Sequence, residues 1–294
     1  MKNLSPTEQI NPRTKNLDQM TPAQLARVMS AEDFNAARAV QKANKQIAAA
    51  LLLAAQTYAA KHKIIFIGAG TSGRLGVLEA AECVPTFGTQ PGQIIGLIAG
   101  GKKAMFRSQE GAEDDAQKGA QEILSKARKG DFVLGLSASG KTPYVLGALK
   151  KAKQLGASTA LLSCNPSADT THAQIHIYLP TGAEVLSGST RLKAGSATKM
   201  ALNAITTGAM ALCGKTYGNL MVDVQPTNKK LVARAVRLIC EIARTDQKTA
   251  ELLLKKSRGN VKTAVVMHRR KLTREQAEKQ LKKRNGFLNK ALND

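Results

Sequence analysis

The sequence contains no tryptophan and only 3% aromatic residues, although 43% of its 294 residues are hydrophobic. Its four cysteines are scattered along the chain and form no C-x-x-C pair. This spacing excludes a disulfide framework or a zinc-binding module as the organising element, and it is typical of thiols in a reducing compartment. We therefore expect a folded protein with a core of Ala, Leu, Val and Ile, comprising one large domain and one small domain.

The sequence also has no long hydrophobic run. The longest apolar stretch, Ile47–Ala55, is far shorter than the roughly 20 residues that span a bilayer. The segment from Met1 to Glu8 lacks the apolar centre of a signal peptide. We therefore expect a cytoplasmic protein that does not associate with membranes.

Acidic residues are scarce, and 44 Lys and Arg against 21 Asp and Glu give a net charge of +23. The excess is concentrated from Gln225 onward, where 19 basic and 6 acidic residues lie. This region contains one aromatic residue, Phe287, and no RNA-binding or zinc-finger pattern, so stacking contacts to bases are nearly absent. We interpret it as a solvated basic helical face whose field would steer anionic substrates, and we do not expect nucleic-acid binding.

Short apolar segments alternate with helical patterns between residues 45 and 224. This alternation predicts an α/β fold, a parallel five-stranded sheet with helices on both faces. The expected strands are residues 63–67, 93–99, 131–136, 157–163 and 174–179. The expected helices are residues 46–61, 73–83 (ended by Pro85), 112–129, a segment from 142 to about 156, and 189–213.

Helical patterns without strand signals lie on both sides of this region. Thr21 and Gln24 form a capping box, and Ser30 is expected to begin a further turn. Thr273 and Gln276 form another capping box. We predict an N-terminal helical arm (1–44), a sheet domain (45–224) and a small C-terminal helical domain (225–294). The expected C-terminal helices are residues 228–243, 248–257, 261–268 and 273–281.

Two hydroxyl-rich loops follow expected strands. The first, Gly68–Arg74, matches G-x-G-x-x-G and contains Thr71 and Ser72, and the second contains Ser137, Ser139 and Thr142. In a parallel sheet both loops reach the same edge. Hydroxyl groups and the free N–H groups at helix N-termini bind phosphate without a metal. The two loops together predict a phosphate site.

The glycine spacing alone would also suit a dinucleotide. Such a site requires an acidic residue at the end of the second strand, to hold the ribose. That strand ends in Ile98-Ala-Gly-Gly101, and the chain has no Walker A motif. The sequence therefore disfavours a nucleotide and favours a smaller phosphorylated molecule.

Carboxylates near this edge are candidates for acid–base chemistry. Glu79 and Glu82 are three residues apart on one expected helix, and Glu113 belongs to an acidic cluster, residues 110–115. Glu184 follows the fifth strand. Two such groups can act on a sugar as general acid and general base if their environments separate their pKa values. His172 and His176 have no evident third ligand, so we predict no metal site.

Seven segments carry a recognisable pattern, in order along nearly the whole chain: Ile67–Gly76, Ala81–Gly88, Glu110–Asp115, Ala138–Val145, Ser163–Pro166, Gly188–Gly195 and Tyr217–Asp223. Together they resemble the N-acetylmuramic acid 6-phosphate etherase family, which is built on a sugar isomerase (SIS) domain of flavodoxin-like type. This sequence departs from the usual etherase pattern in two places. Glu79-Ala-Ala-Glu-Cys83 stands where Asp-Ala-Ser-Glu-Cys is usual, and Lys141 replaces an Arg, giving a point charge in place of a planar fork.

The resemblance implies cleavage of the D-lactyl ether at C3 of N-acetylmuramic acid 6-phosphate, in cell-wall amino-sugar recycling, without a metal or organic cofactor. It places the two catalytic glutamates at Glu82 and Glu113. Our hypothesis is that Glu113 removes the C2 proton and Glu82 protonates the departing oxygen, with the roles reversed when water adds. The residues implied to hold the 6-phosphate are Thr71, Ser72, Ser137, Ser139 and Thr142.

Family members are homodimers with sites near the subunit interface, so Lys193 or Arg191 could contribute from either chain. Two alternatives remain: a phosphosugar isomerase, and a non-catalytic sugar-phosphate sensor such as the related glucokinase regulatory protein. The presence of both Glu82 and Glu113 favours catalysis over sensing. The segment Ala81–Gly88 favours the etherase over a general isomerase.

Overall fold

The computed structural model describes residues 4–226 and 228–293. The chain divides into two compact units. The first, which we call the sheet unit, comprises Met1–Ala81 and Gly92–Thr206, and the second, the helical unit, comprises Glu82–Pro91 and Thr207–Asp294. The domain boundaries after residues 44 and 224 stay predictions. None of the helices within the described ranges is long and apolar enough to span a bilayer.

The sheet unit is built on five parallel strands in the order β2-β1-β3-β4-β5, which confirms the predicted α/β fold. This is the strand order of flavodoxin-like sheets. β1 and β3 are buried along their whole length, as expected for central strands covered on both faces. The strands are β1 Ile64–Gly68, β2 Ile94–Ile98, β3 Phe132–Leu136, β4 Ser158–Ser163 and β5 Ile175–Tyr178.

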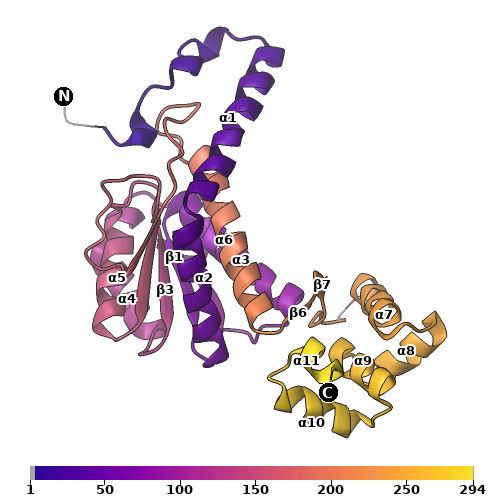
Figure 1. The fold of residues 1–294 in the computed structure, drawn as a ribbon. Helices are drawn as coiled ribbons and strands as arrows, with labels where there is room; N and C mark the ends of the chain where they lie inside the picture. Colours follow the sequence, from indigo (N-terminus) through magenta and orange to yellow (C-terminus); the bar gives the residue numbers. More distant parts are fainter. Residues whose placement is uncertain (1–3, 227, 294) are drawn as a thin grey trace. The chain divides into compact units, whose positions relative to one another are not determined.

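Helices cover both faces of the sheet (Figure 1). α4 (Ala116–Lys126) and α5 (Pro143–Gln154) lie on one face, and Ile65 and Ile67 of β1 share a buried cluster with α5. α2 (Asn44–Ala59), together with α3 (Gly70–Phe87) and α6 (Lys193–Leu212), lies on the other face (Figure 1). Right-handed crossovers explain this division, because the β1–β2 connection runs in the opposite direction to the β3–β4 connection.

The register of the strands brings three loops to one edge. Gly68, the last residue of β1, is paired with Leu136 at the end of β3 and with Ile98 at the end of β2. The loops that follow these three strands are therefore neighbours. β1 lies in the middle, and this is the switch point at which ligands bind in such sheets.

The N-terminal segment is more regular than the sequence suggests. Three short 3₁₀ turns precede α1 (Pro22–Lys42), whose N-terminus carries the predicted capping box of Thr21 and Gln24. The prediction of a new turn at Ser30 is wrong. Ser30 lies inside α1, and its hydroxyl donates to the carbonyl of Ala26 at 3.0 Å, a local bond that a continuous helix tolerates.

Two further helix boundaries differ from expectation. α3 (Gly70–Phe87) does not end before Pro85, because a proline in the last turn removes only one backbone hydrogen bond. The helix expected from residue 112 begins at Ala116. Residues Ala112–Asp114 form the short 3₁₀ helix η5 instead, and the Asp115 side chain caps α4.

The helical unit has its own apolar core, formed by residues such as Ile239, Ala264 and Val265. A small antiparallel hairpin, β6 Thr216–Tyr217 with β7 Leu220–Met221, was not predicted. The capping box of Thr273 and Gln276 is confirmed. The helices are α7 Lys229–Ala243, α8 Gln247–Lys256, α9 Val261–Arg270, α10 Arg274–Lys283 and α11 Leu288–Leu292.

Candidate functional site

The first hydroxyl-bearing loop joins β1 to α3 by a close backbone approach. A Cβ atom on Gly73 would lie 2.6 Å from the carbonyl oxygen of Gly68, so only glycine fits there. Gly70 has φ +51°, a left-handed conformation that glycine adopts readily. The first turn of α3 therefore packs directly on the end of the strand. Thr71 and Ser72 lie half-buried in this turn.

The second loop, after β3, brings three predicted hydroxyl groups together. The Ser137 hydroxyl is buried and shares hydrogen bonds with Thr142 at 2.7 Å and with Ser139 at 3.3 Å. It also accepts a hydrogen bond from the Gly140 amide at 3.0 Å. Thr142 precedes the first residue of α5, so the cluster lies at a helix N-terminus. The positive end of the helix dipole makes this position suitable for an anion.

Glu113 lies on the other side of β1, at a cavity of about 140 Å³ between the loops that follow β1 and β2. Glu113 belongs to η5 and is exposed. The cavity is also lined by Gly70 from the first turn of α3, so Glu113 and the first hydroxyl-bearing loop share one cavity. The other lining residues are Ala69, Arg74, Ala99, Ala104, Ser108, Gln109, Glu110, Gly111 and Ala112.

Arg74 reaches this cavity from the second turn of α3. Its Nε donates to the carbonyl of Met105, at 3.2 Å, in the 3₁₀ helix η4 (Gly101–Met105). This contact holds the loop after β2 against α3. The sequence places Arg74 in the glycine-rich loop Gly68–Arg74, but no local pattern indicates its contact with the loop after β2.

Glu79 and Glu82 both lie on α3, but their surroundings differ. Glu79 is buried and accepts hydrogen bonds from Thr206 and Lys199 of α6, both at 2.6 Å. Glu82 is exposed and belongs to the helical unit. Glu79 is therefore held in contacts between two helices, while Glu82 is accessible for chemistry.

The remaining candidates make structural contacts. Glu184 is buried, and its carboxylate accepts the amide hydrogens of Lys193 (3.0 Å) and Ala194 (2.9 Å), which caps α6. Burial raises the pKa of Glu184, and these two hydrogen bonds only partly oppose the shift. The side chain of Lys193 is buried in an ion pair with Glu32, whereas Arg191 is exposed.

The two histidines show no metal-binding arrangement. His176 lies in β5, and its Nε2 is hydrogen-bonded to the Ser163 hydroxyl at 2.8 Å. Burial lowers the pKa of His176. Across residues 4–226 and 228–293, no group of three or more His, Cys, Asp and Glu side chains could hold a metal ion.

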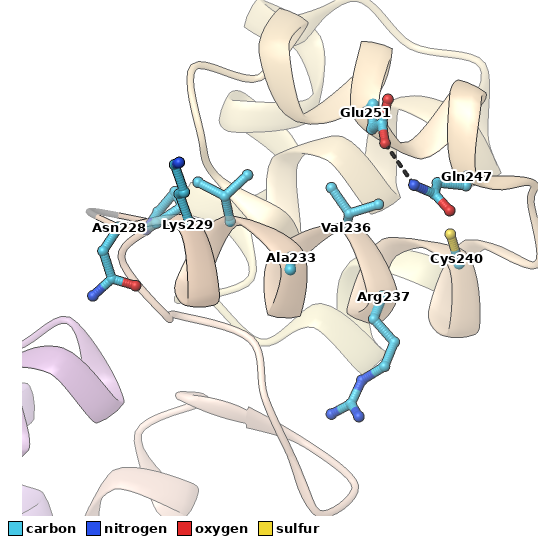
Figure 2. A pocket seen from close by; sticks show the side chains of 10 residues that line it. Asn228, Lys229, Ala233, Val236, Arg237, Cys240, Gln247 and Glu251 are labelled. Atoms are coloured by element: carbon cyan, nitrogen blue, oxygen red, sulfur yellow. Dashed lines mark hydrogen bonds between the residues drawn. The ribbon is translucent and has the colours of Figure 1, made fainter.

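A larger cavity, about 900 Å³, lies within the helical unit (Figure 2). It is formed largely by α7 and α8, and Figure 2 shows the hydrogen bond from Gln247 to Glu251, 2.8 Å long, at one side. Val232, Ala233 and Val236 give it an apolar lining. It contains none of the predicted phosphate-binding or catalytic residues. We therefore do not take it as the candidate active site, although it is the larger of the two cavities.

Two family models match the chain. The N-terminal SIS domain of glucokinase regulatory protein matches residues 46–153, and the SIS domain matches residues 110–208. A phosphoheptose isomerase from Francisella tularensis has a similar solved structure, with a TM-score of 0.49, 13% identity, and coverage of 65% of this chain and 100% of that chain.

Curated relatives are similar over nearly the full length. An N-acetylmuramic acid 6-phosphate etherase from Oenococcus oeni is 46% identical, over 97% of this chain and 97% of the relative. A protein of the same name from Microcystis aeruginosa is 47% identical, over 97% of this chain and 94% of the relative.

Proposed function

Because the chain belongs to the N-acetylmuramic acid 6-phosphate etherase family, we propose that it cleaves the D-lactyl ether at C3 of N-acetylmuramic acid 6-phosphate. The products are N-acetylglucosamine 6-phosphate and D-lactate, and the enzyme is a carbon–oxygen lyase. The observation that supports the proposal within this structure is the position of Glu113, which shares a cavity with Gly70 in the first turn of α3, the turn that also contains the proposed phosphate-binding residues Thr71 and Ser72.

The strand order suggests how the substrate lies. We place the 6-phosphate between the loops after β1 and β3, where Thr71, Ser72, Ser137, Ser139 and Thr142 supply hydroxyl groups. Glu113 lies on the β2 side of β1. Neighbouring strands are about 4.8 Å apart, which is the scale of a hexose. A sugar lying across the end of β1 would therefore present its C2 and C3 atoms toward Glu113.

The reaction follows from the chemistry of the open-chain sugar. The C3 ether oxygen is β to the C1 aldehyde, which makes the C2 proton acidic. Glu113 takes this proton, the C2–H electron pair forms a C2=C3 double bond, and the C3–O bond breaks. Glu82 gives its proton to the departing lactyl oxygen. Glu82 then takes a proton from water as the hydroxyl adds at C3, and Glu113 returns a proton to C2.

Glu82 lies in the last two turns of α3 and is exposed. Because the sites of the etherases that this chain resembles lie near the subunit interface, we propose that Glu82 acts on the substrate bound by a partner subunit, while Glu113 acts in the site of its own chain.

Exposed apolar side chains support a homodimer. Leu52, Leu78 and Met200 are 51%, 42% and 42% exposed, and they lie on α2, α3 and α6, which cover the same face of the sheet (Figure 1). Large apolar residues at such positions are typical of subunit interfaces. We also propose that the homodimer works in the cytoplasm.

The first experiment incubates the protein with N-acetylmuramic acid 6-phosphate and measures D-lactate. In parallel, deuterium exchange from solvent into C2 of N-acetylglucosamine 6-phosphate measures whether the base that removes the C2 proton is active. We expect Glu113→Gln to abolish exchange, and Glu82→Gln to abolish lactate release while retaining exchange. Binding of the sugar phosphate without lactate release would indicate the sensor, and conversion of fructose 6-phosphate would indicate the isomerase.

The second experiment tests the shared site by mixing the two inactive variants. In a mixed dimer of Glu82→Gln and Glu113→Gln chains, one site combines an intact Glu113 with an intact Glu82 from the partner. Random mixing should restore about a quarter of the wild-type activity, because half of the dimers are mixed and each has one complete site. If both glutamates acted within one chain, mixing would restore nothing.

A further inference from the structure

Arg74 and Glu113 line the same cavity at the end of β1, and Arg74 is the cationic residue of its lining. We propose that the Arg74 guanidinium binds the carboxylate of the lactyl group, so that the enzyme selects ethers that carry an acid. This inference rests on the proposed etherase function. It names the part of the site that would distinguish the substrate from an ordinary sugar phosphate.

The contacts of Arg74 leave its outer nitrogen atoms available. Nε donates to the Met105 carbonyl at 3.2 Å, which fixes the plane of the guanidinium. Within the described ranges Arg74 makes no ion pair, although Glu110 and Glu113 line the same cavity. The side chain is half-buried, so a carboxylate placed there would be partly shielded from water. An arginine held in this way can donate two parallel hydrogen bonds to a carboxylate.

The substrate carries two anionic groups, and the fold offers two different places for them. The hydroxyl cluster of Ser137, Ser139 and Thr142 lies at the β3 side of β1 and suits the phosphate. Arg74 contacts η4, which follows β2, and so it lies on the opposite side of β1, at the cavity that Glu113 also lines. The lactyl group is attached to C3, the carbon beside the one that Glu113 deprotonates. Its carboxylate therefore falls on the Arg74 side.

There is also an electrostatic reason for a cation in this cavity. Without Arg74, the lactyl carboxylate would lie against two glutamates, Glu110 and Glu113, in one small cavity. Like charges at this range disfavour binding, and the arginine offsets them. A substrate without the carboxylate gains nothing from Arg74, and this difference can be measured.

The experiment compares two substrates, N-acetylmuramic acid 6-phosphate and its lactyl primary amide, which keeps the ether but loses the negative charge. The quantity measured is the ratio of their kcat/KM values, acid over amide. We expect Arg74→Gln to lower this ratio by roughly 10- to 100-fold, the range for losing a hydrogen bond to a charged group. Arg74→Lys, which keeps the charge without the planar fork, should lower it less.

Arg107→Gln is the matched control, because Arg107 is an exposed arginine in the loop after η4, next in sequence to the cavity-lining Ser108, and does not itself line the cavity. Its ratio should equal that of the wild type. If Arg74→Gln lowers kcat/KM equally for both substrates, Arg74 acts only by holding Met105, and the proposal is overturned. Absence of D-lactate with the wild-type protein would overturn the etherase function together with this proposal, whereas an unchanged ratio with normal lactate release would overturn this proposal alone.

Discussion

Lys193 and Glu32 form a buried ion pair that joins the first residue of α6 to the middle of α1. Both side chains are almost fully shielded from solvent, with 2% and 4% of their surfaces exposed. Asn11 and Arg13, from the N-terminal turns, donate further hydrogen bonds to the Glu32 carboxylate, at 3.0 Å and 3.2 Å. The N-terminal segment is thereby fixed to the start of α6.

Removing one partner of this ion pair should destabilise the folded protein strongly. We expect Lys193→Ala to lower the free energy of unfolding by about 3–5 kcal/mol, because it removes the buried cation from the Glu32 carboxylate and leaves only the exposed Arg13 as a charged partner. Urea denaturation followed by circular dichroism measures the change. The double variant Lys193→Met with Glu32→Leu removes both charges and should recover most of the loss. A double variant as unstable as Lys193→Ala would contradict this explanation.

The same pair predicts sensitivity to acid. Burial alone would raise the pKa of Glu32, but hydrogen bonds and charges from Lys193, Asn11 and Arg13 outweigh it and hold the pKa below its ordinary value of 4.5. A carboxyl whose folded-state pKa is lowered stabilises the fold above its unfolded pKa, and this stabilisation is lost as the pH falls through the folded value.

Stability should therefore decline below about pH 4.5, and Glu32→Gln should show a flatter decline over that range. Thermal unfolding between pH 3 and pH 6 measures both curves. Glu241→Gln is the control, since Glu241 is exposed and its replacement should leave the shape of the wild-type curve unchanged. Parallel curves for Glu32→Gln and wild type would show that protonation of Glu32 does not cause the loss of stability in acid.

The same substitution, Glu to Gln, should mainly affect stability at Glu79 and mainly affect activity at Glu82, both on α3. Glu79→Gln weakens the buried contacts with Lys199 and Thr206, and we expect it to lower the melting temperature by several degrees, for a loss of about 1–3 kcal/mol. Glu82→Gln, at an exposed position, should leave the melting temperature within a degree and reduce lactate release by at least about 100-fold. Differential scanning fluorimetry and a lactate assay on both variants test this contrast.

The loop after β3 should not tolerate a side chain at Gly140. This residue has φ +68°, and an added Cβ would lie 2.2 Å from the Cβ of Ala168. We expect Gly140→Ala to raise KM for the sugar phosphate by about 10-fold or more, because the clash displaces the hydroxyl cluster of Ser137 and Thr142. Gly92→Ala is the control, with φ +82° and no atom within 4 Å of the added Cβ. An equal effect on KM in both variants would argue against a local displacement.

Much of the fold follows from local pattern. Each strand is a short apolar run, and its expected bounds differ from the observed ones by only a residue or so, as with β1 at Ile64–Gly68. The capping boxes at Thr21 and Thr273 formed as expected, because their partners lie three residues away. The hydroxyl groups after β1 and β3 could be placed at one edge because a parallel sheet leaves no other arrangement.

The sequence by itself thus determined the strands, their loops and the family resemblance, since these depend on residues close together in the chain. Only the tertiary structure decided which carboxylates are held in structural contacts. Glu79 is paired with Lys199 and Glu32 with Lys193, partners 120 and 161 residues away in sequence. It also brought Arg74 and Glu113 to the lining of one cavity. Burial and charge pairing depend on how distant segments pack, and no local pattern contains that information.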